Sequence, residues 1–368
     1  MNFHEYIDDI QDVAVKESVK NISHVEIDGY TDIGRNGYVF FGIHKVFKSR
    51  VSIKYYYYGE DTHDEVTVIK TIESKNILHV WDAVEVGEGW AYFITDEMEE
   101  GNLDEYLKKY YLSTSLVIDV VRGILNGLSE LHKPENALVH RDLKPANILF
   151  RGDDRPIIAD FGSIKKIQHG SDHVNASGNS MLYKAPENIL ENRYTYQSDI
   201  YQIGIVLYQL MGGTLSYDIK DYMNKVELRK YQKLNDAYEI SMFEDGVLNK
   251  AITRGKLLDY TSIPCYRCKR IIRIIKNATR VDESKRFRNT ADFLLEIHRL
   301  GKVADWMQSN DDEYECLHNK MYYRVTKIKG RYVFQKSKDR EKWRKVNKIE
   351  PNTCLETLFE DVMAVIGS

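Results

Sequence analysis

Two short polar loops beside apolar runs limit the possible folds of this chain more than any other feature. In the stretch "ALVHRDLKPANILF" the apolar ends are strand-like, so they can anchor the polar centre in a hydrophobic core. A later stretch, "IIADFGS", again ends an apolar run with a carboxylate, Asp160. Because the core holds Asp142, Lys144 and Asn147 in one short turn, we expect a rigid loop whose side chains serve chemistry.

These residue types are the ones that phosphoryl transfer requires. The reaction needs positioned Mg²⁺, neutralisation of charge, and a carboxylate that orients the attacking hydroxyl. Mg²⁺ is a hard cation that prefers oxygen ligands, so Asn147 and Asp160 are the expected metal ligands and Asp142 is left as the base. Lys144 can then neutralise the migrating phosphate.

With these residues, the sequence resembles the eukaryotic-type protein kinase family. Residues 140–147 match the catalytic loop H-R-D-L-K-x-x-N without a substitution, residues 160–162 match D-F-G, and residues 185–187 match A-P-E. The resemblance covers about residues 25–300. It implies an α+β, two-lobed protein kinase fold with a small β-rich N-terminal lobe and a larger helical C-terminal lobe.

A lysine and a glutamate upstream complete the expected nucleotide clamp. "VSIK" resembles the family's V-A-I-K, which makes Lys54 the candidate for holding the α- and β-phosphates of ATP. On the helix expected to follow, Glu65 shares a face with Ile69 and Ile72, so it points toward the apolar side and needs a cationic partner. Lys54 is the obvious partner; the alternatives are that Glu73 takes this role or that Glu65 is solvated.

The segment "DIGRNGYVFFG" fits the family's glycine-rich phosphate loop incompletely, because Asp32 stands at the first glycine. A shifted fit starts at Gly34 and puts Asn36 in second position. Glycine permits close approach of backbone amides to phosphates in either register, although "GRNG" alone is typical of a β-turn. The nucleotide contacts that this resemblance implies are Gly34, Arg35, Asn36, Gly37 and Val39.

The segment "AYFITDEMEEGNL" resembles the family's connection between the lobes. The resemblance implies that Thr95 is the gatekeeper and that the backbone of Asp96 and Met98 hydrogen-bonds adenine. By themselves, these residues indicate only a strand that leads into a turn.

The resemblance also bears on substrate class and on the scaffold. Lys144 in "RDLKPAN" is of the serine/threonine-kinase type, while tyrosine or dual specificity stays open. Against the family's G-T-x-x-Y-x-A-P-E motif we place Asn179 at the threonine, so the hydroxyl that bridges base and lysine is missing unless Ser180 shifts in. The resemblance places the activation segment at residues 163–184, and Glu187 and Arg286 are expected to form a structural ion pair beneath it.

We predict four segments along the chain. Residues 1–22 form an N-terminal extension with an amphipathic helix, residues 23–97 the β-rich lobe, residues 98–300 the helical lobe, and residues 301–368 a small β-rich accessory module. The module alternates apolar and basic residues, which favours a sheet that has a solvated face and an aromatic core. An acidic partner for this basic module is possible, and nucleic acid is not expected.

Composition narrows the remaining classes. A chain with 43% hydrophobic residues and a net charge of −4 should bury a core and should not bind polyanions over its whole surface. Its four cysteines are too few for a disulfide scaffold, which favours a reducing, cytoplasmic location. Cys265 and Cys268 have zinc-like spacing, but a helix with Cys268 on its apolar side is the better interpretation. The most apolar helix, "IYQIGIVLYQLMGG", is shorter than the ~20 residues that span a bilayer, so no membrane segment is expected.

The resulting hypothesis is a protein kinase that uses ATP and Mg²⁺ to phosphorylate serine or threonine in protein substrates, with autophosphorylation. One alternative is a pseudokinase that acts as a binding scaffold. Another is a small-molecule kinase of related fold, against which "KAPEN" and the serine-rich loop before it argue, since they indicate peptide docking.

Overall fold

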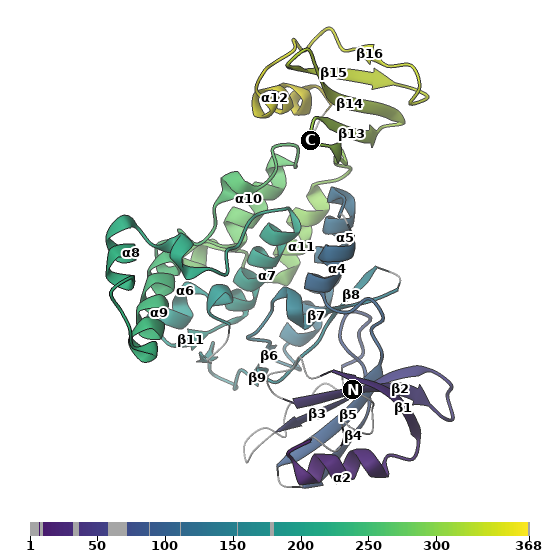
Figure 1. Cartoon of the computed structure of the whole chain (residues 1–368), viewed down its shortest axis with the longest axis vertical. Coiled ribbons are helices and arrows are strands. Elements are labelled where there is room, and N and C mark those ends of the chain that lie inside the picture. Colours follow the sequence, from purple (N-terminus) through teal and green to yellow (C-terminus); the bar gives the residue numbers. More distant parts are fainter. Residues whose placement is uncertain are drawn as a thin grey trace. The chain divides into compact units, whose positions relative to one another are not determined.

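The computed structural model describes residues 7, 10–31, 37–57, 72–87, 89–110, 112–152, 154–176 and 180–366. Figure 1 shows the helices and strands of the chain. The chain divides into two compact units, each of which is described by itself. The first unit comprises Met1–Tyr106, Asn126–His140 and Pro145–Lys166, and the second comprises Leu107–Leu125, Arg141–Lys144 and Ile167–Ser368.

A five-stranded antiparallel sheet with the order β1-β2-β3-β5-β4 forms the centre of the first unit. Its strands are β1 (Val25–Thr31), β2 (Gly37–His44), β3 (Arg50–Tyr57), β4 (Val80–Gly87) and β5 (Trp90–Asp96). β4 and β5 form a hairpin, in which Gly87 and Gly89 have φ values of 103° and 77° that glycine adopts without strain.

The helix α2 (Val13–Asn21) shares a hydrophobic core with this sheet. Val15 and Val19 are buried in that core together with Tyr55 of β3. Ser18 Oγ lies 2.9 Å from the Tyr55 hydroxyl, and the Tyr38 hydroxyl donates to Asp12 at 2.8 Å. The N-terminal segment is therefore part of the folded unit. The helix expected within residues 1–22 is present from Val13 onward, and most of the residues before position 10 lie outside the described chain.

The rest of the first unit consists of short elements that lead to the polar loops. The hairpin of β7 (Ile148–Arg151) and β8 (Arg155–Ile158) follows the 3-10 turn η1 (Pro145–Asn147), and β6 (Leu138–Val139) pairs with β9 (Lys165–Lys166). Two helices earlier in the chain, α4 (Leu103–Lys109) and α5 (Thr114–His132), each contribute residues to both units.

The second unit is mainly helical around α7 (Tyr196–Leu210). This is the apolar helix that the sequence predicts for the core: Ile200, Ile203 and Leu207 have no exposed surface. In the described part of the chain, no helix has the length and apolar character needed to cross a membrane. The other helical elements are α6 (Pro186–Leu190), α8 (Lys225–Tyr231), α9 (Ala237–Thr253), α10 (Lys269–Ala278), α11 (Thr290–Arg299), η2 (Met181–Tyr183), η3 (Ile219–Tyr222), η4 (Tyr260–Ser262) and η5 (Glu283–Lys285). Two short strands, β10 (Val174–Asn175) and β11 (Arg193–Tyr194), also pair here.

The expected C-terminal β-rich module is present in the second unit. It is an antiparallel sheet of β12 (Met307–Asn310), β13 (Glu313–His318), β14 (Met321–Ile328), β15 (Arg331–Ser337) and β16 (Arg344–Lys345), followed by α12 (Leu355–Ile366). Trp306, Phe334 and Phe359 are almost completely buried in its core, and Trp306 packs edge-on against Phe359 at 5.0 Å. The α+β fold class is thus confirmed. The residue numbers at which we divided the sequence into four segments stay a prediction.

Candidate active site

Lys54 and Asp160 meet within the first unit. On β3, Lys54 alternates with the buried Ile53 and Tyr55, so it projects from the opposite face of the sheet. Its Nζ lies 2.8 Å from Asp160 Oδ1, with side chains 29% and 45% exposed. Val39 is the cross-strand neighbour of Lys54, so these two side chains share a face. The Lys54–Asp160 ion pair therefore lies next to the apolar side chain of Val39.

The backbone around Asp160 holds its carboxylate in place. Asp160 has a φ of 60°, a left-handed conformation that is costly for a residue other than glycine and that concentrates at functional sites. His140, which has no exposed surface, places its Nε2 3.1 Å from the carbonyl oxygen of Ala159, and its ring lies 5.8 Å from that of Phe161. Both contacts fix the chain on either side of Asp160.

Asn147 lies at the same end of the β7–β8 hairpin as Asp160. Ile148 pairs with Ile158, and the amide of Ala159 donates to the carbonyl oxygen of Asn147 at 3.0 Å. Asn147 directly precedes β7, and Asp160 follows β8 by two residues, so both lie at this end of the hairpin. An amide oxygen and a carboxylate are donors that Mg²⁺ accepts, so the residues present fit this metal.

The residues expected to line the adenine site occupy the end of β5. Thr95 is buried and its hydroxyl donates to the carbonyl oxygen of His79 at 2.7 Å. The Asp96 carboxylate pairs with Arg151. Beside Asp96 and Met98, a cavity of ≈ 380 Å³ lies between the loop before β4 and the β7–β8 hairpin. The Asp96 side chain therefore points toward Arg151 at the end of β7.

Of the expected phosphate loop, the structure describes only the residues from Gly37 onward. Gly37 begins β2, where a Cβ atom would come 1.9 Å from the carbonyl oxygen of Tyr55. Close pairing of β2 with β3 thus requires glycine at this position, whatever else it does. Gly34, Arg35, Asn36 and Glu65 lie outside the described residues.

Within the second unit, Lys144 joins the proposed base to a serine hydroxyl. Its Nζ donates to Asp142 Oδ2 at 2.8 Å and to Ser180 Oγ at 2.7 Å. The sequence reading that put Asn179 at this position was wrong. The threonine of the family motif stands three residues before its tyrosine, and three residues before Tyr183 is Ser180. The bridging hydroxyl is therefore present.

Two buried side chains of α7 support the loop that carries Asp142. Asp199 accepts from the backbone amide of Arg141 at 3.0 Å, and Gln202 accepts from that of Leu143 at 2.8 Å. The Tyr194 hydroxyl donates to both of them, at 2.6 and 2.9 Å. Burial and the Asp199 carboxylate raise the pKa of Tyr194 well above its usual value, so this donor keeps its proton. Sequence reasoning missed Gln202, because it is one of three glutamines in α7 and nothing in the sequence distinguishes it from the other two.

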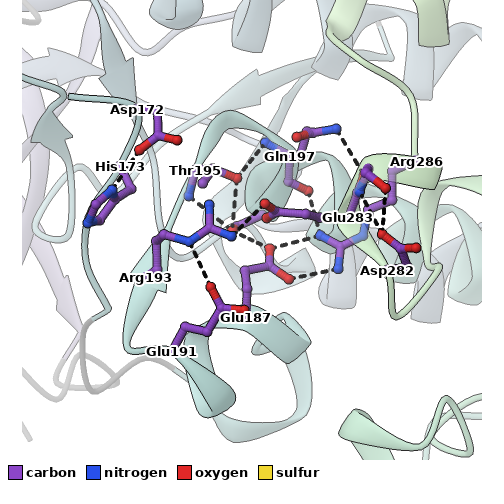
Figure 2. Close-up of polar contacts among 12 residues, drawn as sticks. Asp172, His173, Glu187, Glu191, Arg193, Thr195, Gln197, Asp282, Glu283 and Arg286 are labelled. Atoms are coloured by element: carbon purple, nitrogen blue, oxygen red, sulfur yellow. Dashed lines mark hydrogen bonds and ion pairs between the residues drawn. The ribbon is translucent and has the colours of Figure 1, made fainter. Parts of the chain in front are cut away.

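The expected ion pair between Glu187 and Arg286 is present and buried (Figure 2). Arg286 donates to both carboxylate oxygens, at 2.8 and 2.7 Å, and its side chain has no exposed surface. A second arginine was not predicted: Arg193 of β11 binds Glu191 and Glu283, the latter at 2.6 Å (Figure 2). It anchors the strand with which β10 of the activation segment pairs.

All four cysteines carry free thiols. Burial raises the pKa of Cys265 to about 11, so its thiol stays protonated. Among the described residues, no three histidine, cysteine or acidic side chains gather in a way that could hold a metal ion.

Comparisons with known proteins identify the family of the chain. The protein kinase domain family model matches residues 32–296. The chain is 31% identical to "Serine/threonine-protein kinase atg1" of Dictyostelium discoideum, over 46% of this chain and 26% of that protein. It is 28% identical to "Probable serine/threonine-protein kinase MARK-C" of the same organism, over 59% and 30%. It is also 26% identical to "Serine/threonine-protein kinase Nek2" of Homo sapiens, over 53% and 46%. The chain thus spans less than half of the length of each of these relatives.

Proposed function

We propose that this chain, which belongs to the protein kinase domain family, transfers the γ-phosphate of ATP to serine and threonine hydroxyls of protein substrates. The observation that carries the proposal is the contact of Lys144 with both Asp142 and Ser180. In this arrangement Asp142 accepts the hydrogen bond of the substrate hydroxyl and orients its oxygen for attack. Lys144 neutralises negative charge on the transferring phosphate.

The nucleotide is bound by the residues expected from the sequence. Lys54 holds the α- and β-phosphates, with Glu65 as its ion-pair partner in the active form, and the backbone of residues 34–37 covers them while Val39 contacts the base. Asp96 and Met98 hydrogen-bond adenine through their backbone, beside the gatekeeper Thr95. Asn147 and Asp160 hold Mg²⁺, which supplies charge neutralisation at the phosphates when bound. The present pairing of Lys54 with Asp160 supports this assignment, because both are needed at the same phosphates.

Specificity for serine and threonine rests on Lys144 and on the names of the relatives. Tyrosine or dual specificity is the second candidate, and a scaffold without catalysis the third. We place autophosphorylation in the activation segment, at Ser171, Ser177 or Ser180. The free thiols support a cytoplasmic location. An acidic protein partner for the basic C-terminal module completes the proposal.

Radiolabelled ATP with generic protein substrates tests the proposal. Asp142→Asn should lower labelling by about 10²–10⁴-fold, the range for loss of a positioned proton acceptor, without changing the melting temperature. The matched control Asp311→Asn changes an exposed carboxylate and should label like the parent chain. Undiminished labelling by Asp142→Asn would refute the catalytic role. Phosphotyrosine as the sole product would refute the specificity, and labelled metabolite without labelled protein would favour a small-molecule kinase.

A further inference from the structure

Basic charge is concentrated in one part of the C-terminal module. Residues 320–348 contain 12 lysines and arginines and two acidic residues, a net charge of +10. Because the whole chain carries −4, the remaining residues carry −14. The segment is thus opposite in sign to the rest of the molecule, which marks it as an electrostatic binding surface.

A minority of these cations have acidic partners. Arg340 pairs with Glu315 at 2.8 Å, Lys327 with Asp312 at 3.2 Å, and two further pairs are longer than 3.4 Å. Eight exposed cations have no ion-pair partner among the described residues: Lys320, Lys329, Arg331, Lys336, Lys338, Lys342, Arg344 and Lys348. Most of the positive charge is therefore available to an external anion.

Strand pairing brings part of this charge together at one end of the sheet. Lys336 of β15 stands directly opposite Arg344 of β16, and on its other side opposite Tyr323 of β14. Opposed residues project from the same face, and like charges in such a pair repel each other and destabilise a sheet. An anion that binds beside both cations would reduce this repulsion. Lys320 and Lys338 flank the same end, because Tyr322 pairs with Ser337. We name Lys320, Lys336, Lys338, Lys342 and Arg344 the basic patch.

The loop between β15 and β16 is folded so that it presents cations rather than neutralising them. Asp339 accepts hydrogen bonds from the backbone amides of Lys342 and Glu341, at 2.9 and 3.0 Å, and from the Ser337 hydroxyl at 2.8 Å. These bonds lower the pKa of Asp339 to about 2. One of the two acidic residues of the segment is thus engaged by the loop's own backbone.

Three aromatic residues close to the basic patch already pack against other side chains. Phe334 is buried, Tyr323 stacks on it at 5.5 Å, and the guanidinium of Arg324 covers the Trp343 ring at 4.2 Å. Single-stranded nucleic acid is bound mainly through stacking of its bases on aromatic side chains, so it is disfavoured as the occupant.

The pairing of the strands in this sheet also disfavours a membrane surface as the binding partner of the basic patch. The exposed large apolar side chains of the sheet are Met307, Leu317 and Ile328. They share a face with Tyr322 and Arg324, opposite to the face of Tyr323 and Lys336. The basic patch thus lacks apolar groups of the sheet that could enter a bilayer beside it.

We infer that the basic patch docks an acidic segment, rich in aspartate and glutamate, of a partner protein. This inference gives a location to the acidic partner of the proposed function. It needs no phosphoryl transfer, so a binding measurement tests it independently of catalysis.

The test titrates the whole chain against fluorescein-labelled polyglutamate and follows anisotropy at low salt. Lys336→Glu/Arg344→Glu should weaken binding about tenfold, which corresponds to about 1.4 kcal/mol. The matched control, Lys329→Glu/Arg331→Glu, makes the same charge change at the β14–β15 turn at the other end of the sheet, and should weaken binding less than about twofold. Both double variants should retain the parent's melting temperature and protein labelling. If the first double variant unfolds, Lys336→Gln/Arg344→Gln replaces it in the same comparison.

Equal loss of affinity in the two double variants would overturn the inference, because it would indicate attraction by net charge alone. Polyuridylate or phosphatidylserine vesicles that bind more tightly than polyglutamate would overturn the choice of partner. Absence of polyglutamate binding at low salt would overturn the docking site itself, while leaving the kinase proposal untouched.

Discussion

Removing one partner of the buried Glu187–Arg286 pair should destabilise the second unit strongly. In Glu187→Gln, one of the two oxygens that accept from Arg286 becomes a donor, so a charged hydrogen bond is lost at a side chain with no exposed surface. Breaking such a pair on one side costs about 3–5 kcal/mol. The carbonyl oxygens of Arg280, Gln197 and Val281 still accept from the guanidinium, which places the expected loss near about 3 kcal/mol.

Urea unfolding followed by circular dichroism measures this loss as a shift in the midpoint at constant slope. Glu296→Gln is the matched control, because it removes an exposed pair with Arg299 and should cost about 0–1 kcal/mol. Adding Arg286→Met to Glu187→Gln removes the uncompensated charge, so the double variant should lose less than the sum of the two single variants. If Glu187→Gln costs no more than Glu296→Gln, the argument from buried charge is refuted.

Three further results are expected. Ser180→Ala removes the hydroxyl that contacts Lys144 and should lower protein labelling about tenfold, whereas Ser180→Thr should preserve it; equal labelling by the alanine variant would contradict the contact's role. Val15→Asp buries a carboxylate in the core of α2 and the sheet and should cost several kcal/mol in thermal unfolding, against ~0.5 kcal/mol or less for Val13→Asp, whose site is 59% exposed. The Asp339 carboxyl should titrate near pH 2 when followed by NMR, below its ordinary pKa of 3.8. Because folding lowers this pKa, the ionised carboxylate stabilises the folded chain above pH 3.8, and this stabilisation is lost as the pH falls toward 2. A measured pKa of 3.8 or higher would contradict the hydrogen bonds of the loop.

The local parts of the candidate site could be predicted because the residues that form them are neighbours in the sequence. Asp142 and Lys144 stand two positions apart, so a rigid loop brings them together without help from distant segments. The chain brings Gln202 to Leu143 only through tertiary packing, and a glutamine in an apolar helix does not by itself indicate what it binds. Propensity likewise cannot predict two-residue strands such as β10, which exist because β11 lies beside them.

The N-terminal helix shows a similar limit. Apolar periodicity predicts an amphipathic helix, but it does not identify the surface that the helix covers. The structure shows that this surface is one face of β3. Ile53 and Tyr55 of β3 share a core with α2, while Lys54 between them projects from the opposite face. The helix therefore helps to hold the strand that carries a proposed nucleotide-binding lysine, a relation that no motif encodes.

The C-terminal module is tied to the same compact unit as Asp142. Tyr266, which precedes α10, lies in the module's core 5.3 Å from the ring of Tyr314. Asp305, which precedes β12, accepts from the amide of Thr114 at 2.6 Å, where a carboxylate is favoured at the start of α5. Arg267 reaches the same helix through the Thr114 hydroxyl at 3.0 Å. Because these contacts join the module to the helical part, a protein held at the basic patch is held by the unit that also carries the proposed base. Docking there would raise the local concentration of a substrate without any change at the catalytic loop.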